Sequence, residues 1–351
     1  MDAIVDESTP TPAPVRSRGP LVAGVVLGAV AAAVATVVLA NGLASPAPTV
    51  EAGPPRDQGA RAEPTLAPSP TPVAFTAADA LAGAAAAAAQ FSPPSLASGQ
   101  YLRHAWTETT LALVDPDPSS SGWSSPDYGI ARGMASGGWT ITRSGSDYSP
   151  ADPHSDWYRE WGAPSVTGTY GAATPSDRGV ESLLQAYGTG QPLYTEGGAP
   201  TLPEGSGETF VWYLDNMPRD PQAMLDWVID RQGEDAAGWV EGKAGWFLIG
   251  ILSYNAGDPA ARAAIYQALG LLSGTTVGPE IAGTRTLTFD AHLASPDAGG
   301  ISLRRYTLTI DMSTGLVTET STTSDVGTGV IPDAVPDHRI TYAMSIVDGL
   351  P

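Results

Sequence analysis

The uncharged segment LVAGVVLGAVAAAVATVVLA, Leu21 to Ala40, constrains the architecture of this chain more than any other feature. Twenty residues of α-helix rise about 30 Å, which matches the hydrocarbon thickness of a bilayer. A cleavable signal peptide usually has an apolar run of only about 7–15 residues. The segment therefore predicts a permanent transmembrane helix over residues 21–43. Cleavage of the N-terminal segment stays open as an alternative, because the small residues of Gly42-Leu43-Ala44 also suit a signal peptidase.

The charges that flank this segment predict its orientation. Arg16 and Arg18 precede it, whereas residues 41–55 contain neither Lys nor Arg. Basic residues close to a span favour the cytoplasmic side. We therefore expect a single-pass protein of the cell membrane, with residues 1–20 as a short cytoplasmic tail and the C-terminal domain outside the cytoplasm.

Small residues follow one face of the predicted span. Gly24, Gly28 and Ala32 recur at intervals of four, the spacing at which two transmembrane helices can pack closely. The pattern predicts a homodimer that forms through the span. The alternative is composition alone, since an alanine-rich segment produces such spacings by chance.

Charge and cysteine content exclude several classes of partner. The chain holds 17 Lys and Arg against 37 Asp and Glu, a formal net charge of −20. Such a surface repels phosphate backbones, so a nucleic-acid partner is excluded. The chain has no cysteine, which leaves no disulfide and no lipidated anchor. A domain outside the membrane must then be stabilised by burial of its own core.

The chain changes character after the span. Residues 44–75 hold eight prolines and few apolar residues, so they predict an extended, polyproline-rich linker outside the cytoplasm. Residues 76–351 are enough to bury a core and predict one extracytoplasmic α+β domain. Its first helix is expected at AADALAGAAAAAAQ, with Thr76 as N-cap and Asp79 at the third helical position.

Strands and helices then alternate in groups. GQYLRHAWTETTLALV, GWTITR, DWYREW and ETFVWYLD are rich in β-formers and predict strands. Residues 115–137 predict a loop. Asp220-Pro221 and Asp258-Pro259 each predict a helix start, and GWFLIGILSY between them predicts a buried helix.

The last third predicts strands again. RTLTFDAHL alternates, with Leu287, Phe289, Ala291 and Leu293 on one face. ISLRRYTLTID and GLVTETSTTS flank DMSTG, a hairpin turn with Gly315 available for positive φ. A final strand places Ile340, Tyr342, Met344 and Ile346 on one face. The predicted fold is an antiparallel sheet with helices packed on one side.

Three segments carry a family resemblance. GQYLRHAWTET, DPQAMLDWV and RRYTLTIDMSTGLVTE resemble uncharacterised actinobacterial single-span membrane proteins with an extracytoplasmic domain, which are often encoded beside sigma factors. The last of these segments is also similar to sheet segments of half-barrel lipoprotein-carrier and sensor domains. The resemblance implies a half-barrel-like sheet with an apolar concave face, and it brings no catalytic residue.

Aromatic residues are the strongest candidates for ligand binding. Trp157, Tyr158 and Trp161 cluster in sequence, and Trp212 lies in a segment predicted as a strand. Aromatic faces bind sugars and apolar ligands well. The alternative is that these residues fill the core of a domain without disulfides.

Candidates for metal binding or catalysis are weaker. Asp152, His154 and Asp156 alternate, so on a strand they would share a face and could hold a divalent cation; the alternative is a polar loop. The chain contains neither G-x-S-x-G nor H-E-x-x-H, and its only lysine, Lys243, lacks a serine three residues earlier. We predict no catalytic residue and no cofactor, and the sequence favours a non-enzymatic protein.

These observations predict a membrane-anchored extracytoplasmic protein that binds or senses an apolar ligand or an envelope component. One alternative is a cell-wall-associated hydrolase or sugar-binding protein that uses the region from Trp157 to Trp161. Another is a structural partner in an envelope complex.

Overall fold

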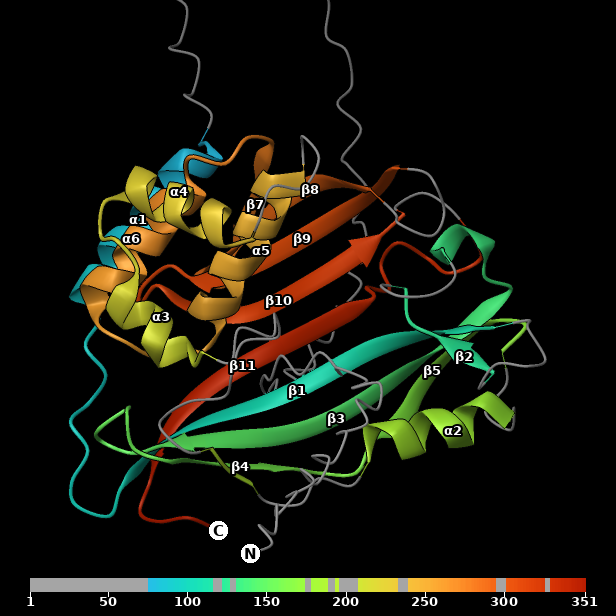
Figure 1. The fold of residues 1–351 in the computed structure, drawn as a ribbon, viewed down its shortest axis with the longest axis horizontal. Helices are drawn as coiled ribbons and strands as arrows, with labels where there is room; N and C mark the ends of the chain where they lie inside the picture. Colours follow the sequence, from blue (N-terminus) through green and yellow to red (C-terminus); the bar gives the residue numbers. More distant parts are fainter. Residues whose placement is uncertain are drawn as a thin grey trace, which may run out of the picture.

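The computed structural model describes residues 75–115, 122–126, 131–173, 178–188, 193–195, 208–232, 239–294, 301–325 and 329–351. They form one antiparallel sheet with helices on one face, which confirms the predicted α+β class (Figure 1). The predicted tail, the span with Gly24, Gly28 and Ala32, and all of the linker except Phe75 lie outside these residues. Within them, no helix has both the length and the apolar character that a bilayer crossing requires.

The sheet joins strands from both ends of the domain. Its order is β6 (Leu193–Thr195), β4 (Trp157–Trp161), β3 (Gly137–Ser149), β1 (Tyr101–Val114), β11 (His338–Val347), β10 (Leu316–Ser324), β9 (Ile301–Asp311), β8 (Thr284–Ala294) and β7 (Thr275–Ile281). Two further strands pair off this path, β2 (Trp123–Ser124) with β1 and β5 (Ser165–Gly171) with β3. β11 therefore lies between β1 and β10 and connects the two halves of the sheet.

In the described part of the chain, six α-helices and one short 3₁₀ helix accompany the sheet: α1 (Ala77–Gln90), η1 (Arg132–Met134), α2 (Arg178–Tyr187), α3 (Phe210–Asn216), α4 (Pro221–Gln232), α5 (Trp239–Ser253) and α6 (Pro259–Leu269). α1 begins with the predicted cap. The Thr76 hydroxyl accepts a hydrogen bond from the Asp79 N–H (3.1 Å), and the Asp79 carboxylate accepts one from the Thr76 N–H (2.9 Å). Asp258 caps α6 through a single bond, in which its carboxylate accepts from the Ala261 N–H (2.7 Å).

The strand prediction for ETFVWYLD is wrong, because this segment forms the helix α3. The Thr209 hydroxyl accepts a hydrogen bond from the Trp212 N–H (3.2 Å), which satisfies one of the free donors at a helix start. Phe210, Tyr213 and Leu214 are then buried among the other helices. A short apolar run has no period that separates helix from strand, so the cap and the packing decide its conformation.

The main core lies between helices α1 and α3 to α6 and strands β8 to β10. Leu287, Phe289 and Ala291 of β8 are buried there, as the alternation of RTLTFDAHL predicts; the side chain of Leu293 lies outside the described set. A second core lies between α2, the last residues of β1 and the first residues of β3. The helices of the two cores cover the same face of the sheet. Residues directly opposite each other on neighbouring strands point to the same side, and the pairs from β8 across to β3 place the buried residues of both cores on one side.

Two contacts fix the helices to β10. Gly315, in the predicted hairpin turn, has φ +64°, and a Cβ there would lie 2.6 Å from the Ala88 nitrogen of α1. Its position therefore requires glycine. After α5, the Asn255 amide donates to the Val317 carbonyl (2.8 Å) and accepts from the Val317 N–H (2.7 Å). β11 pairs with β10 only over Glu319–Thr322, so Asn255 satisfies backbone groups that β11 leaves open.

Candidate ligand-binding pocket

An apolar cavity of about 420 Å³ lies beside the first residues of β1 and the last residues of β3. Four segments enclose it: residues 93–96 after α1, the turn at 150–153, α3, and the turn at 256–258. Figure 1 shows the first of these running from α1 to the start of β1. Cavities of about 300–1,000 Å³ are typical of sites for small molecules.

The lining is mainly apolar and includes several prolines. Pro93, Pro94, Pro150 and Pro153 contribute from two loops. Proline has no backbone N–H, so these loops present surface to the cavity without adding a donor that needs a partner. Leu96, Leu102, Ala151, Trp157, Phe210, Val211, Leu214, Ala256 and Gly257 complete the apolar part, and Ser95, Ser149, Asp215 and Asp258 are polar.

Trp157 forms an aromatic wall of the cavity. Its side chain is 1% exposed, and its indole N–H donates to the Pro153 carbonyl (2.9 Å). The ring stacks on His104, with centroids 5.4 Å apart, and meets Phe210 edge-on at the same centroid distance. Phe210 in turn stacks on Tyr254 (4.4 Å). The ring contacts fix the position of the Trp157 indole, and the bond to Pro153 satisfies its N–H.

A buried charged pair lies behind this wall. Arg159 of β4 binds the Asp147 carboxylate of β3 through its Nε and Nη2. Burial would lower the pKa of Arg159, but the charge and hydrogen bonds of Asp147 outweigh burial and raise it. Burial lowers the pKa of His104 to about 4, against the opposing effect of Asp147. His104 is therefore neutral at pH 7, with its Nε2 3.3 Å from the Ser149 hydroxyl.

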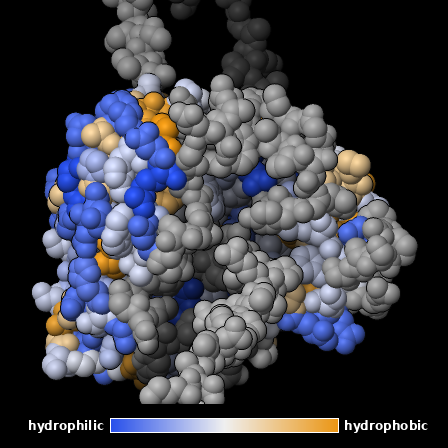
Figure 2. Space-filling model, in the orientation of Figure 1, coloured by the Kyte–Doolittle hydropathy of each residue, from blue (hydrophilic) through white to orange (hydrophobic). Residues whose placement is uncertain are grey.

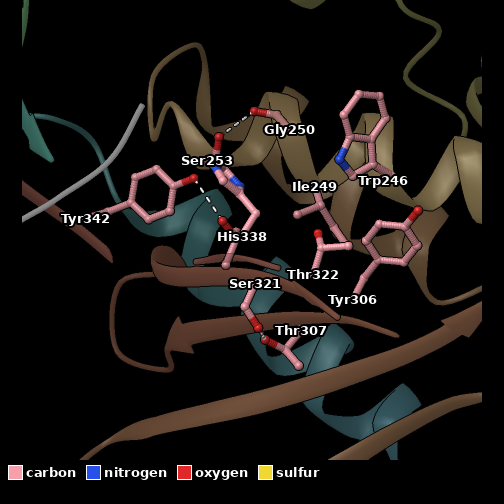
Figure 3. A pocket seen from close by; sticks show the side chains of 11 residues that line it. Trp246, Ile249, Gly250, Ser253, Tyr306, Thr307, Ser321, Thr322, His338 and Tyr342 are labelled. Atoms are coloured by element: carbon pink, nitrogen blue, oxygen red, sulfur yellow. Dashed lines mark hydrogen bonds between the residues drawn. The ribbon is translucent and has the colours of Figure 1, made fainter. Parts of the chain in front are cut away.

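A second cavity, of about 20 Å³, lies between α5 and strands β9 to β11 (Figure 3). Trp246 and Tyr342 border it, as does His338, whose Nε2 lies 2.8 Å from the Glu108 carboxylate. Burial alone would raise the pKa of Glu108, but His338 and Arg143 together lower it. A cavity of this size holds one water molecule, so it cannot be a ligand site.

The face shown in Figure 2 offers no broad apolar surface over the described helices. That side is mostly hydrophilic, with small, scattered hydrophobic patches.

Of the four predicted ligand-binding aromatics, only Trp157 lines the larger cavity. Tyr158 packs against Tyr148 (centroids 5.7 Å apart), and Trp161 packs with the buried Trp106. Trp212 lies on α3 rather than on a strand, and the Arg231 guanidinium sits 4.8 Å above its ring. Leu102, Phe210 and Ala256 could not be recognised as site residues from the sequence, because only the tertiary fold brings them to one place.

The predicted metal-binding residues do not share a strand face, because residues 151–155 form a turn. The Asp152 carboxylate accepts hydrogen bonds from the His154 N–H (3.0 Å) and the Ser155 hydroxyl (3.3 Å), and His154 Nε2 lies 3.4 Å from Asp215. Asp156 has no assigned secondary structure and directly precedes β4. In the part of the chain that the structure describes, no three His, Asp or Glu side chains are grouped so as to hold a metal ion.

Comparisons with known proteins add little to this geometry. No protein-family model matches the chain, and no curated protein sequence matches it. A solved structure titled "Lipid-protein interactions in lipovitellin" aligns with 9% identity and a TM-score of 0.24, over 75% of this chain. This chain spans only 26% of that one. A TM-score this low does not show a shared fold, so the resemblance to actinobacterial and half-barrel proteins stays a prediction.

Proposed function

We propose that this protein binds an apolar small molecule or acyl chain in the cavity beside Trp157. The observation that supports the proposal is the cavity itself: about 420 Å³, with thirteen of its seventeen lining residues apolar. Transfer of an apolar surface from water into such a cavity is favourable by about 25 cal/mol per Å² buried. Two serines and two aspartates supply the polar contacts that orient a ligand.

The setting proposed for this site is supported by the sequence alone. We propose that the protein is anchored by residues 21–43 with its binding domain outside the cytoplasm, where it senses or carries its ligand without catalysis. A sugar-binding role for the region from Trp157 to Trp161 is less favourable. Trp157 is almost fully buried and Trp161 packs in a core cluster, so these rings do not form an open platform.

A photoreactive probe tests the proposal on the full-length protein. The probe is a neutral long-chain alcohol that carries a diazirine near its alkyl end. After irradiation, mass spectrometry maps the labelled peptides. We expect saturable labelling on residues 93–96 and 210–214, which excess unlabelled alcohol suppresses.

Two variants separate the cavity from general adsorption. Ala151→Trp enlarges an exposed residue of the lining and should reduce specific labelling about tenfold by filling the cavity mouth. Ala343→Trp makes the same change at an exposed position of β11, outside the lining, and should label as the wild type does. Equal labelling of both variants, or labelling that spreads over the surface, would refute the proposed site.

A further inference from the structure

We propose that the cavity beside Trp157 selects apolar ligands with a cationic head group, an amine or a quaternary ammonium, over ligands with an anionic one. This inference rests on the proposed function and names the class of ligand for the same site. It is carried by the distribution of charge around the cavity.

Carboxylates border the cavity on two elements. Asp215 lies in the last turn of α3 and Asp258 at the start of α6, with side chains 52% and 50% exposed. A half-exposed position at the border of an apolar cavity is where an amphiphile places its head group, because the chain is buried and the head stays hydrated. A head group in this position would lie beside these carboxylates.

Compensating positive charge is unevenly distributed between the two carboxylates. Arg219 Nη2 lies 3.0 Å from Asp258, so that carboxylate is matched by a full positive charge. Among the residues that the structure describes, the only ion-pair partner of Asp215 is the imidazole of His154, at 3.4 Å, and that group is charged only when protonated. Asp215 therefore makes the larger contribution to the negative potential at the cavity mouth.

The cavity lining itself supplies no positive charge. No Lys or Arg is among its described lining residues. Behind Trp157, His104 is neutral at pH 7, and the charge of Arg159 is matched by Asp147. The net charge of −20 adds a long-range repulsion for anions. A fatty-acid carboxylate would therefore find no cation in the lining, whereas an ammonium would find Asp215.

The experiment compares three photoreactive probes of equal chain length that end in hydroxyl, trimethylammonium or carboxylate. Interaction with one half-exposed charge changes affinity about threefold to fivefold, so the ammonium and carboxylate probes should differ about tenfold. The hydroxyl probe should lie between them. We expect this order in the concentration that gives half-maximal labelling of residues 93–96 and 210–214.

Asp215→Asn tests the named carboxylate. It should lower the affinity of the ammonium probe relative to the hydroxyl probe about threefold. The matched control, Asp230→Asn, removes one exposed carboxylate from α4, outside the cavity lining, and should keep the wild-type ratio.

The outcomes distinguish this inference from the proposed function. If the hydroxyl probe does not label the cavity, the proposed function fails. If it labels the cavity but the three probes bind equally, or the carboxylate probe binds best, only the head-group selectivity is overturned. The same holds if Asp215→Asn and Asp230→Asn change the probe ratio equally.

Discussion

The buried imidazole behind the pocket should make the stability of this domain depend on pH. His104 has a pKa of about 4 in the folded protein, against an ordinary value of 6.5. Between these values the unfolded chain binds the proton and the folded chain does not, so acid favours unfolding. The contribution of neutral His104 is fully present above pH 6.5 and is lost as the pH falls toward 4.

The magnitude follows from the size of the shift. One pKa unit corresponds to about 1.36 kcal/mol, so a shift from 6.5 to about 4 is worth about 3 kcal/mol in total. For a domain of this size, about 3 kcal/mol lowers the melting temperature by roughly 6–12 °C. Other carboxylates add their own pH dependence, so the effect of His104 has to be measured as a difference between variants.

His104→Phe removes the titration and keeps an aromatic ring against Trp157. His104→Gln removes it and keeps a polar group near the Ser149 hydroxyl. The assay is thermal unfolding of the full-length protein in a nonionic detergent, followed by tryptophan fluorescence at pH values from 4.5 to 7.5. At pH 7.5 both variants should be less stable than the wild type. At pH 4.5 this deficit should shrink by about 2–3 kcal/mol, because only the wild type is destabilised through this group.

One outcome of this experiment would refute the depressed pKa of His104. If the difference in free energy of unfolding between wild type and both variants is the same at pH 4.5 and 7.5, His104 does not carry a depressed pKa. Because the two substitutions differ in packing, a change seen in only one of them would assign the effect to the new side chain instead.

Two further predictions concern the sheet and the membrane. Asn255→Gly suits the positive φ of +52° at this position but removes two hydrogen bonds to Val317. It should therefore lower the free energy of unfolding, measured by denaturant titration, by about 2–4 kcal/mol. A loss below about 0.5 kcal/mol would show that water replaces the amide. A phosphatase fused to the C-terminus should be active in intact bacteria if residues 21–43 span the membrane with the N-terminus inside; a stable but inactive fusion would contradict that orientation.

Features set by near neighbours in the sequence could be predicted. The cap at Thr76, the start of α6 at Asp258-Pro259 and the turn at Gly315 each depend on a few adjacent residues, and each is confirmed. The strand over GQYLRHAWTETTLALV is confirmed as β1 for the same reason. α3 was missed because its aromatic residues favour strands locally, while its burial among other helices favours a helix.

Features that depend on distant residues could not be predicted. Arg132 lies in a segment expected to be a loop, yet it is fully buried and donates to the Asp337 carboxylate (2.7 Å) and to the Pro332 carbonyl (2.6 Å). Most residues of the candidate pocket could not be predicted either, because they too are distant in the sequence. Trp157 could be selected for its aromatic character, but its neighbours in the pocket come from segments that meet only in the folded chain.

The position of β11 has a consequence for how the domain can be made. β11 follows every other strand of the sheet in the chain, yet it pairs with β1 through ten residue pairs, from Tyr101 with Val347 to Thr110 with His338. Until β11 emerges from the ribosome or crosses a membrane, β1 and β10 both end in an open edge, and such edges readily pair with other chains. Closing a contact over more than 200 residues is also slow. We therefore expect that shielding the open edges of β1 and β10 until β11 is available would raise the yield of native protein.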